Sequence, residues 1–75
     1  MSYALHETVV LARDLPDQKL RSGDLGAVVA VYPPDALEVE FVTASGRTSA
    51  LVTLRVSDVR RISDTDLVAV RPLSV

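Results

Sequence analysis

The sequence lacks cysteine and tryptophan and has a single histidine, His6. Without cysteine, the fold can be held neither by disulfides nor by a thiolate zinc site. Histidine is the residue that most often acts in acid–base catalysis. We expect His6 to lie in a frayed N-terminal segment, where it could not be held in a catalytic site. None of the three glycines belongs to a phosphate-binding Gly-Lys-Ser/Thr loop. We therefore expect no enzymatic activity, no metal site and no cofactor.

Basic charge and long apolar runs are also scarce. Eight Lys or Arg residues stand against ten Asp or Glu, which gives a net charge of −2. Nucleic-acid-binding domains usually gather a basic excess on one face, so this balance argues against nucleic acid as the partner. The longest apolar run, Ala27 to Tyr32, is far shorter than the ~20 residues of a membrane-spanning helix. Since the N-terminus also lacks a cationic head before an apolar stretch, we expect a cytoplasmic protein without membrane contact.

β-branched residues are abundant in this sequence. Thirteen valines, five threonines and one isoleucine make up a quarter of the 75 residues, a bias that favours strands over helices. Apolar residues account for 48% of the chain, which is enough for one packed core. No segment keeps a helical period over ten residues. The sequence therefore predicts one all-β domain over residues 1–75, with a core at about 7–62 and a C-terminal tail strand at 63–75.

Five short segments have the composition of strands. The clearest is 37–43, where Leu37, Val39 and Phe41 alternate with two glutamates, so that one face is apolar and the other charged. The five expected strands are residues 8–12, 27–32, 37–43, 49–54 and 60–62, and the tail adds a sixth candidate. The expected turns are residues 22–26, 33–35, 44–47 and 56–59, the last of them a single 3₁₀ turn.

Two details of this pattern stay open or irregular. In 49–54 the register is ambiguous, because either Ala50 or Leu51 can face the core. Residues 13–20 contain Pro16 and are expected to form an irregular loop that Leu15 and Leu20 anchor. The order of strands, hairpin and 3₁₀ turn favours a small SH3-like barrel of five or six strands. An open oligonucleotide-binding-type barrel is the alternative, although it needs a helix between the third and fourth strands.

Several groups of residues resemble a family of small bacterial proteins, the domain-of-unknown-function family 4926, over residues 5 to 62. These groups are Val9 to Leu11, Asp14-Leu15-Pro16, Leu20-x-x-Gly23-Asp24-x-Gly26-x-Val28-Val29, Val31-Tyr32, Glu38-Val39-Glu40-Phe41, Gly46-Arg47-Thr48 and Leu51-x-Thr53-Leu54. The resemblance implies an SH3-like barrel and supplies no catalytic residues. The segment from Gly23 to Val29 is also distantly similar to the KOW motif of ribosomal proteins and transcription elongation factors. A tight turn before a buried strand explains that segment on steric grounds alone.

Two regions are candidates for binding. The candidate interaction surface consists of Tyr32, Glu38, Glu40, Arg47, Arg55, Arg60 and Arg61, which mix acidic, basic and aromatic side chains. The candidate pairing edge is the uncharged, β-prone segment Leu67, Val68, Ala69 and Val70. This edge can cover its own barrel, pair with a second copy to give a homo-oligomer, or add to the sheet of a partner.

The absences and the two surfaces together favour a non-enzymatic protein-interaction module. We expect its partner to be another protein, and we expect it to act as an inhibitor or antitoxin-like partner of a neighbouring protein. The alternative is a KOW-like nucleic-acid-binding barrel that uses Arg47, Arg55, Arg60 and Arg61, which requires these four arginines to lie on one face.

Overall fold

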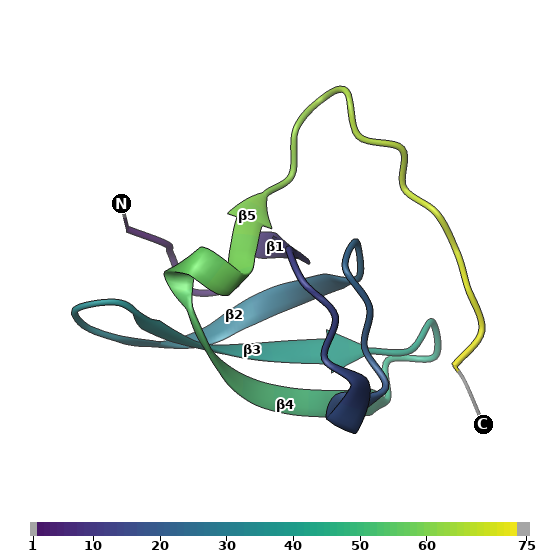
Figure 1. The fold of residues 1–75 in the computed structure, drawn as a ribbon, viewed down its shortest axis with the longest axis horizontal. Helices are drawn as coiled ribbons and strands as arrows, with labels where there is room; N and C mark the ends of the chain where they lie inside the picture. Colours follow the sequence, from purple (N-terminus) through teal and green to yellow (C-terminus); the bar gives the residue numbers. More distant parts are fainter. Residues whose placement is uncertain (1, 74–75) are drawn as a thin grey trace.

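Five antiparallel strands form one sheet in the order β4-β3-β2-β1-β5 (Figure 1). The computed structural model describes residues 2–73. The strands are β1 (Thr8–Leu11), β2 (Leu25–Tyr32), β3 (Ala36–Val42), β4 (Thr48–Arg55) and β5 (Val59–Arg61), with 3₁₀ turns η1 (Pro16–Gln18) and η2 (Val56–Asp58). The predicted all-β class, the five short strands and the 3₁₀ turn before the last strand are confirmed. The SH3-like barrel stays a prediction.

The loop between β1 and β2 contains a 3₁₀ turn that the sequence did not indicate. Leu15 and Leu20 form an isolated antiparallel bridge, and both side chains are buried, so the predicted anchoring of this loop is correct. Between them, η1 begins at Pro16, whose fixed φ suits the first position of a helical turn. Lys19 then closes the turn in the left-handed conformation, with φ of 58°.

The core lies on one face of the sheet and follows the alternation of β3. Leu37, Val39 and Phe41 are buried there, as predicted. The register of β4 is now fixed, because Ala50 is buried beside them whereas Leu51 is 55% exposed. The sheet therefore has an inner face, which carries the core, and an outer face on the opposite side.

The N-terminal segment is part of the core, so the expectation that it is frayed was wrong. Tyr3 is only 7% exposed and packs in the core cluster. The guanidinium carbon of Arg61 lies 4.3 Å from the centre of the Tyr3 ring, a cation–π contact. The backbone N–H of His6 donates to the carbonyl of Val28, and the Nε of Arg61 donates to Glu7 at 2.7 Å. The core thus begins at Tyr3 and not at residue 7.

The predicted C-terminal tail strand at 63–75 was also wrong over residues 63–73, and its last two residues lie outside the described part of the chain. Residues 62–73 form no strand, and Leu67 to Val70 run as an extended segment beside the sheet (Figure 1). The reason lies at the two ends of this segment, where Arg60 binds Asp66 and Asp24 binds Arg71. These ion pairs direct the chain past the sheet instead of along one of its end strands. We call residues 67–73 the C-terminal arm.

Within residues 2–73, neither 3₁₀ turn is long or apolar enough to cross a membrane. The helical content of this part of the chain is limited to the three residues of η1 and the three of η2. The strands therefore place the side chains discussed below.

Candidate functional site

The outer face of β2, β3 and β4 brings together four residues of the predicted interaction surface. Glu38 and Glu40 alternate with the core residues of β3 and point outward. Tyr32 joins them from β2, since its hydroxyl donates to Glu38 Oε1 at 2.6 Å. Arg55, at the end of β4, pairs with Ala36, which is two residues before Glu38 in β3. Its side chain is therefore on the same face as the two glutamates.

This outer face also carries an exposed leucine that the sequence had left unassigned. Leu51 lies directly opposite Glu40 in the β3–β4 ladder, so both side chains are on the outer face. Leu51 is 55% exposed and Tyr32 is 46% exposed. We define the outer-face patch as Tyr32, Glu38, Glu40, Leu51 and Arg55. In the sequence, the only indication of an exposed Leu51 was the ambiguous register of 49–54. The β3–β4 pairing resolved that register.

Hydrogen bonds hold the two carboxylates of the outer-face patch in place. The Tyr32 hydroxyl donates to Glu38, and this hydrogen bond raises the pKa of Tyr32 because ionisation would place two negative charges together. The Thr48 hydroxyl donates to Glu40 Oε2 at 2.6 Å. The patch therefore presents a neutral phenol beside two oriented acceptor groups.

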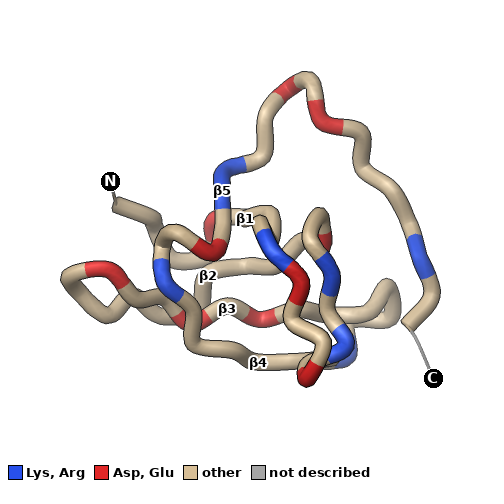
Figure 2. The backbone as a smooth tube through the Cα atoms, in the orientation of Figure 1, with Lys and Arg blue, Asp and Glu red and all other residues tan. Residues whose placement is uncertain are grey.

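The remaining predicted arginines do not join this patch. Arg47 lies in the β3–β4 hairpin turn and Arg55 at the far end of the eight-residue β4, which at ~3.3 Å per residue separates them by more than about 20 Å. Arg60 pairs with Asp66, and Arg61 pairs with Glu7. Figure 2 shows basic positions spread along the chain and separated by acidic ones. The four arginines therefore do not form one basic cluster.

The carboxyl groups with shifted pKa values are all stabilised in the charged form. A hydrogen bond from Arg13 lowers the pKa of Asp58, and a backbone hydrogen bond from Ala4 lowers that of Glu7. A general acid at neutral pH needs the opposite shift. In the described part of the chain, no three His, Asp or Glu side chains gather closely enough to hold a metal ion.

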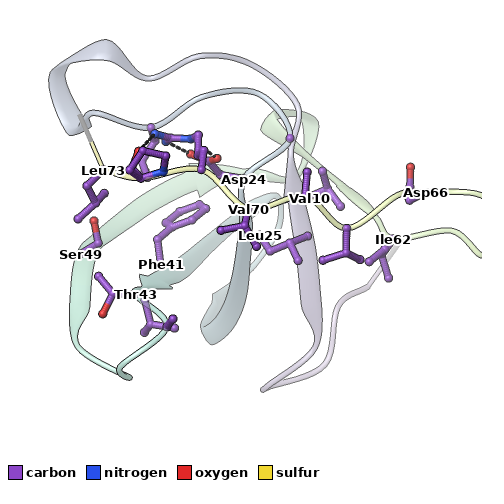
Figure 3. A pocket seen from close by; sticks show the side chains of 18 of the residues that line it. Val10, Asp24, Leu25, Phe41, Thr43, Ser49, Ile62, Asp66, Val70 and Leu73 are labelled. Atoms are coloured by element: carbon purple, nitrogen blue, oxygen red, sulfur yellow. Dashed lines mark hydrogen bonds and ion pairs between the residues drawn. The ribbon is translucent and has the colours of Figure 1, made fainter.

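A second site lies between the C-terminal arm and the sheet, and the sequence did not predict it. A pocket of about 540 Å³ is lined by Val10, Leu25 and Phe41 on the sheet side and by the arm on the other (Figure 3). Val10 alternates with two core residues of β1 and so points away from the core, yet it is only 4% exposed. Its burial shows that chain outside the core covers this part of the outer face.

Two bidentate ion pairs fasten the arm. Arg71 donates from Nε to Asp24 Oδ1 at 2.9 Å and from Nη2 to Oδ2, and Nη2 also donates to the Lys19 carbonyl. Arg60 donates from Nη1 and Nη2 to the two oxygens of Asp66 at 2.9 and 3.0 Å. Paired geometry of this kind is the strongest that arginine makes with a carboxylate.

These contacts lower the pKa values of both carboxyl groups. Desolvation acts to raise the pKa of Asp24, but hydrogen bonds from Arg71 and the Arg21 backbone outweigh it, so the net shift is downward. The Arg60 guanidinium and the Ser63 backbone N–H lower the pKa of Asp66 from its usual 3.8 to about 2. Both carboxylates are therefore charged at neutral pH.

Acidification is expected to weaken the attachment of the arm at Asp66. Because its pKa is lower in the folded chain than the usual 3.8, this ion pair contributes fully above about pH 4. The contribution is lost as the pH falls toward 2. In an NMR titration, the amide signals of Leu67 and Val68 should move with the Asp66 carboxyl signal.

Two variants check this titration. Asp66→Asn should give arm signals at pH 7 that resemble those of the wild type at low pH. Asp64→Asn removes a nearby carboxylate that makes no ion pair in residues 2–73 and should leave the titration unchanged. An arm whose signals do not follow Asp66 would contradict the assigned contact.

The comparison with known families covers the whole sheet. The family profile described as Domain of unknown function (DUF4926) matches residues 5–61, well over half of the chain. The chain belongs to the DUF4926 family. The matched range ends at Arg61, the last residue of β5, so this DUF4926 sheet is matched in full and the arm lies beyond it. No curated protein and no solved structure matches the chain significantly.

Proposed function

We propose that this DUF4926 protein is a non-enzymatic protein-interaction module that binds a partner protein through the outer-face patch. The observation that supports this proposal is the exposure of Tyr32 and Leu51 on a paired sheet next to two hydrogen-bonded glutamates. Tyrosine is enriched in interfaces because its ring buries apolar area while its hydroxyl keeps a polar partner. The strands hold this surface rigid, so little entropy is lost when it binds.

The chemistry of the patch indicates the kind of partner. Glu38 and Glu40 give the patch a negative centre, while Leu51 supplies an apolar contact beside it. A complementary surface carries Lys or Arg around an apolar side chain, and electrostatic attraction then increases the association rate. An inhibitor or antitoxin-like role fits this arrangement, because such a protein acts by covering a surface of its partner.

Leu51→Asp is expected to abolish or strongly weaken partner binding, by about tenfold or more, because it places a charge in the apolar part of the patch. The measurement is affinity co-purification from the native host, followed by calorimetry with the recovered protein. Leu5→Asp is the matched control, since Leu5 is 56% exposed and lies outside the patch. Equal recovery with both variants, or recovery of nothing above background with the wild type, would count against the proposal.

The KOW-like nucleic-acid-binding alternative has weaker support. It needs Arg47, Arg55, Arg60 and Arg61 on one face, whereas β4 separates the first two and ion pairs engage the other two. A gel-shift titration at low salt with single- and double-stranded probes distinguishes the alternatives. Binding of a probe that weakens steeply with added salt would favour the nucleic-acid-binding hypothesis.

A further inference from the structure

The C-terminal arm is fastened at its ends and uncovered in the middle. The Arg60–Asp66 and Arg71–Asp24 ion pairs hold the two ends. Between them, Leu67 and Val70 are 95% and 99% exposed. In residues 2–73, no backbone hydrogen bond joins 67–70 to a strand. The middle of the arm is thus an unpaired, uncharged, β-prone segment, the kind that readily pairs with another chain.

The arm also leaves space beneath it. The pocket of about 540 Å³ is lined by Leu25 and Phe41 of the sheet (Figure 3). Val68 of the arm also lines it. Pockets of ~300–1,000 Å³ with apolar walls are typical of ligand-binding sites. Within one chain, the arm and the sheet therefore bury little apolar surface against each other, because the pocket separates them.

We propose that two copies of the chain exchange their arms, so that Arg71 of each copy pairs with Asp24 of the other. The second copy is the partner that the site fits, because its arm supplies the guanidinium that Asp24 binds and the apolar residues that line the pocket opposite the sheet. The turn at 63–66 acts as the hinge. Exchange repeats the contacts that the arm makes within one chain and adds contacts between Leu67 and Val70 of two adjacent arms.

Symmetry makes this exchange self-consistent. A two-fold dimer requires one surface to be complementary to itself, so that residue i contacts residue j and residue j contacts residue i. The pair of Asp24 on the body and Arg71 on the arm meets this requirement without any further residue. Because the same ion pairs form in the closed monomer and in the exchanged dimer, the new arm–arm contacts decide the balance between them.

Charge reversal separates exchange from closure within one chain. Asp24→Arg and Arg71→Asp each place like charges at both ends of the contact, so either variant alone should sediment as a monomer. When the two variants are mixed, an exchanged heterodimer regains both ion pairs, whereas neither closed monomer can form one. Analytical ultracentrifugation should show twice the 8.1 kDa chain mass for the mixture and for concentrated wild type. The mixed dimer should be tighter than the wild-type dimer by about tenfold or more, because closure no longer competes.

Three results would overturn the proposal: a monomeric mixture, wild type that stays monomeric at millimolar concentration, or wild-type dimers that both single variants retain. The double variant Asp24→Arg, Arg71→Asp is the control, since it restores the pair with reversed polarity within one chain and should behave as the wild type does. Circular dichroism shows whether each variant keeps the sheet.

A second measurement uses the wild type alone, because Asp24 also accepts a hydrogen bond from the Arg21 backbone and its replacement can unfold the loop. In a mixture of isotope-labelled and unlabelled chains, filtered NMR spectra should show contacts between the side chain of Arg71 in one copy and that of Asp24 in another. Contacts confined to single chains would exclude exchange. None of the outer-face patch residues lines the pocket, so this proposal and the proposed function are tested independently.

Discussion

Leu37→Ala is expected to lower the free energy of unfolding by about 2–5 kcal/mol, because it removes a fully packed core side chain. Leu37 lies in β3, which pairs with β2 on one side and β4 on the other, and it is 1% exposed. Removing its branched side chain leaves a cavity that the paired backbone around it cannot close. A domain of this size has a stability of only about 4–11 kcal/mol, so the loss is a large share of the total.

Thermal and urea unfolding, followed by circular dichroism, measure this effect. The melting temperature should fall by about 10 °C or more. Leu51→Ala is the matched control, because it makes the same chemical change in the neighbouring strand at a side chain that is 55% exposed. It should shift the free energy of unfolding by less than about 0.5 kcal/mol. Equal losses from both variants would mean that the two faces of the sheet are wrongly assigned.

Gly26→Ala is expected to cost about 1–3 kcal/mol, although alanine in a strand is otherwise preferred over glycine. A Cβ at this position would lie 2.5 Å from Val39 Cγ1 and 3.1 Å from the Glu40 carbonyl oxygen. Val39 has no exposed surface, so its side chain cannot move away into solvent. The glycine thus allows close packing of the inner face, and its φ is not in the left-handed region.

A double-mutant cycle tests this cause directly. Val39→Ala removes the methyl group nearest to the added Cβ, so Gly26→Ala should cost less in that background than in the wild type. Urea unfolding of the four proteins gives the coupling free energy. If the two substitutions add without coupling, the cost at Gly26 arises from something other than contact with Val39.

Local patterns in the sequence were sufficient where one short segment carried the whole signal. The alternation from Leu37 to Phe41 identified β3 and its buried face. Gly46, with φ of 86°, and the residues around it identified the β3–β4 hairpin. The short segment before β5 correctly indicated η2, whose Asp58 accepts a hydrogen bond from the Arg55 backbone N–H. In each case the competing conformations differ in steric cost within a few residues.

The candidate sites were less predictable than the strands. The sequence grouped Arg60 and Arg61 with the outer-face residues, but each has an intramolecular carboxylate partner, Asp66 or Glu7. The residues of one such pair, Arg61 and Glu7, are 54 positions apart. Spacing along the chain carries no information on which cation meets which anion at that separation.

The sequence by itself determined the all-β class, the place of the five strands along the chain and the buried face of β3. These follow from backbone sterics and from the two-residue period of side chains in a strand, both of which act locally. Only the tertiary structure decided that Tyr3 completes the core, that Val10 is covered and that the arm runs beside the sheet. Each of these depends on contacts between distant residues, whose formation reflects the whole folded arrangement and not the preference of any single segment.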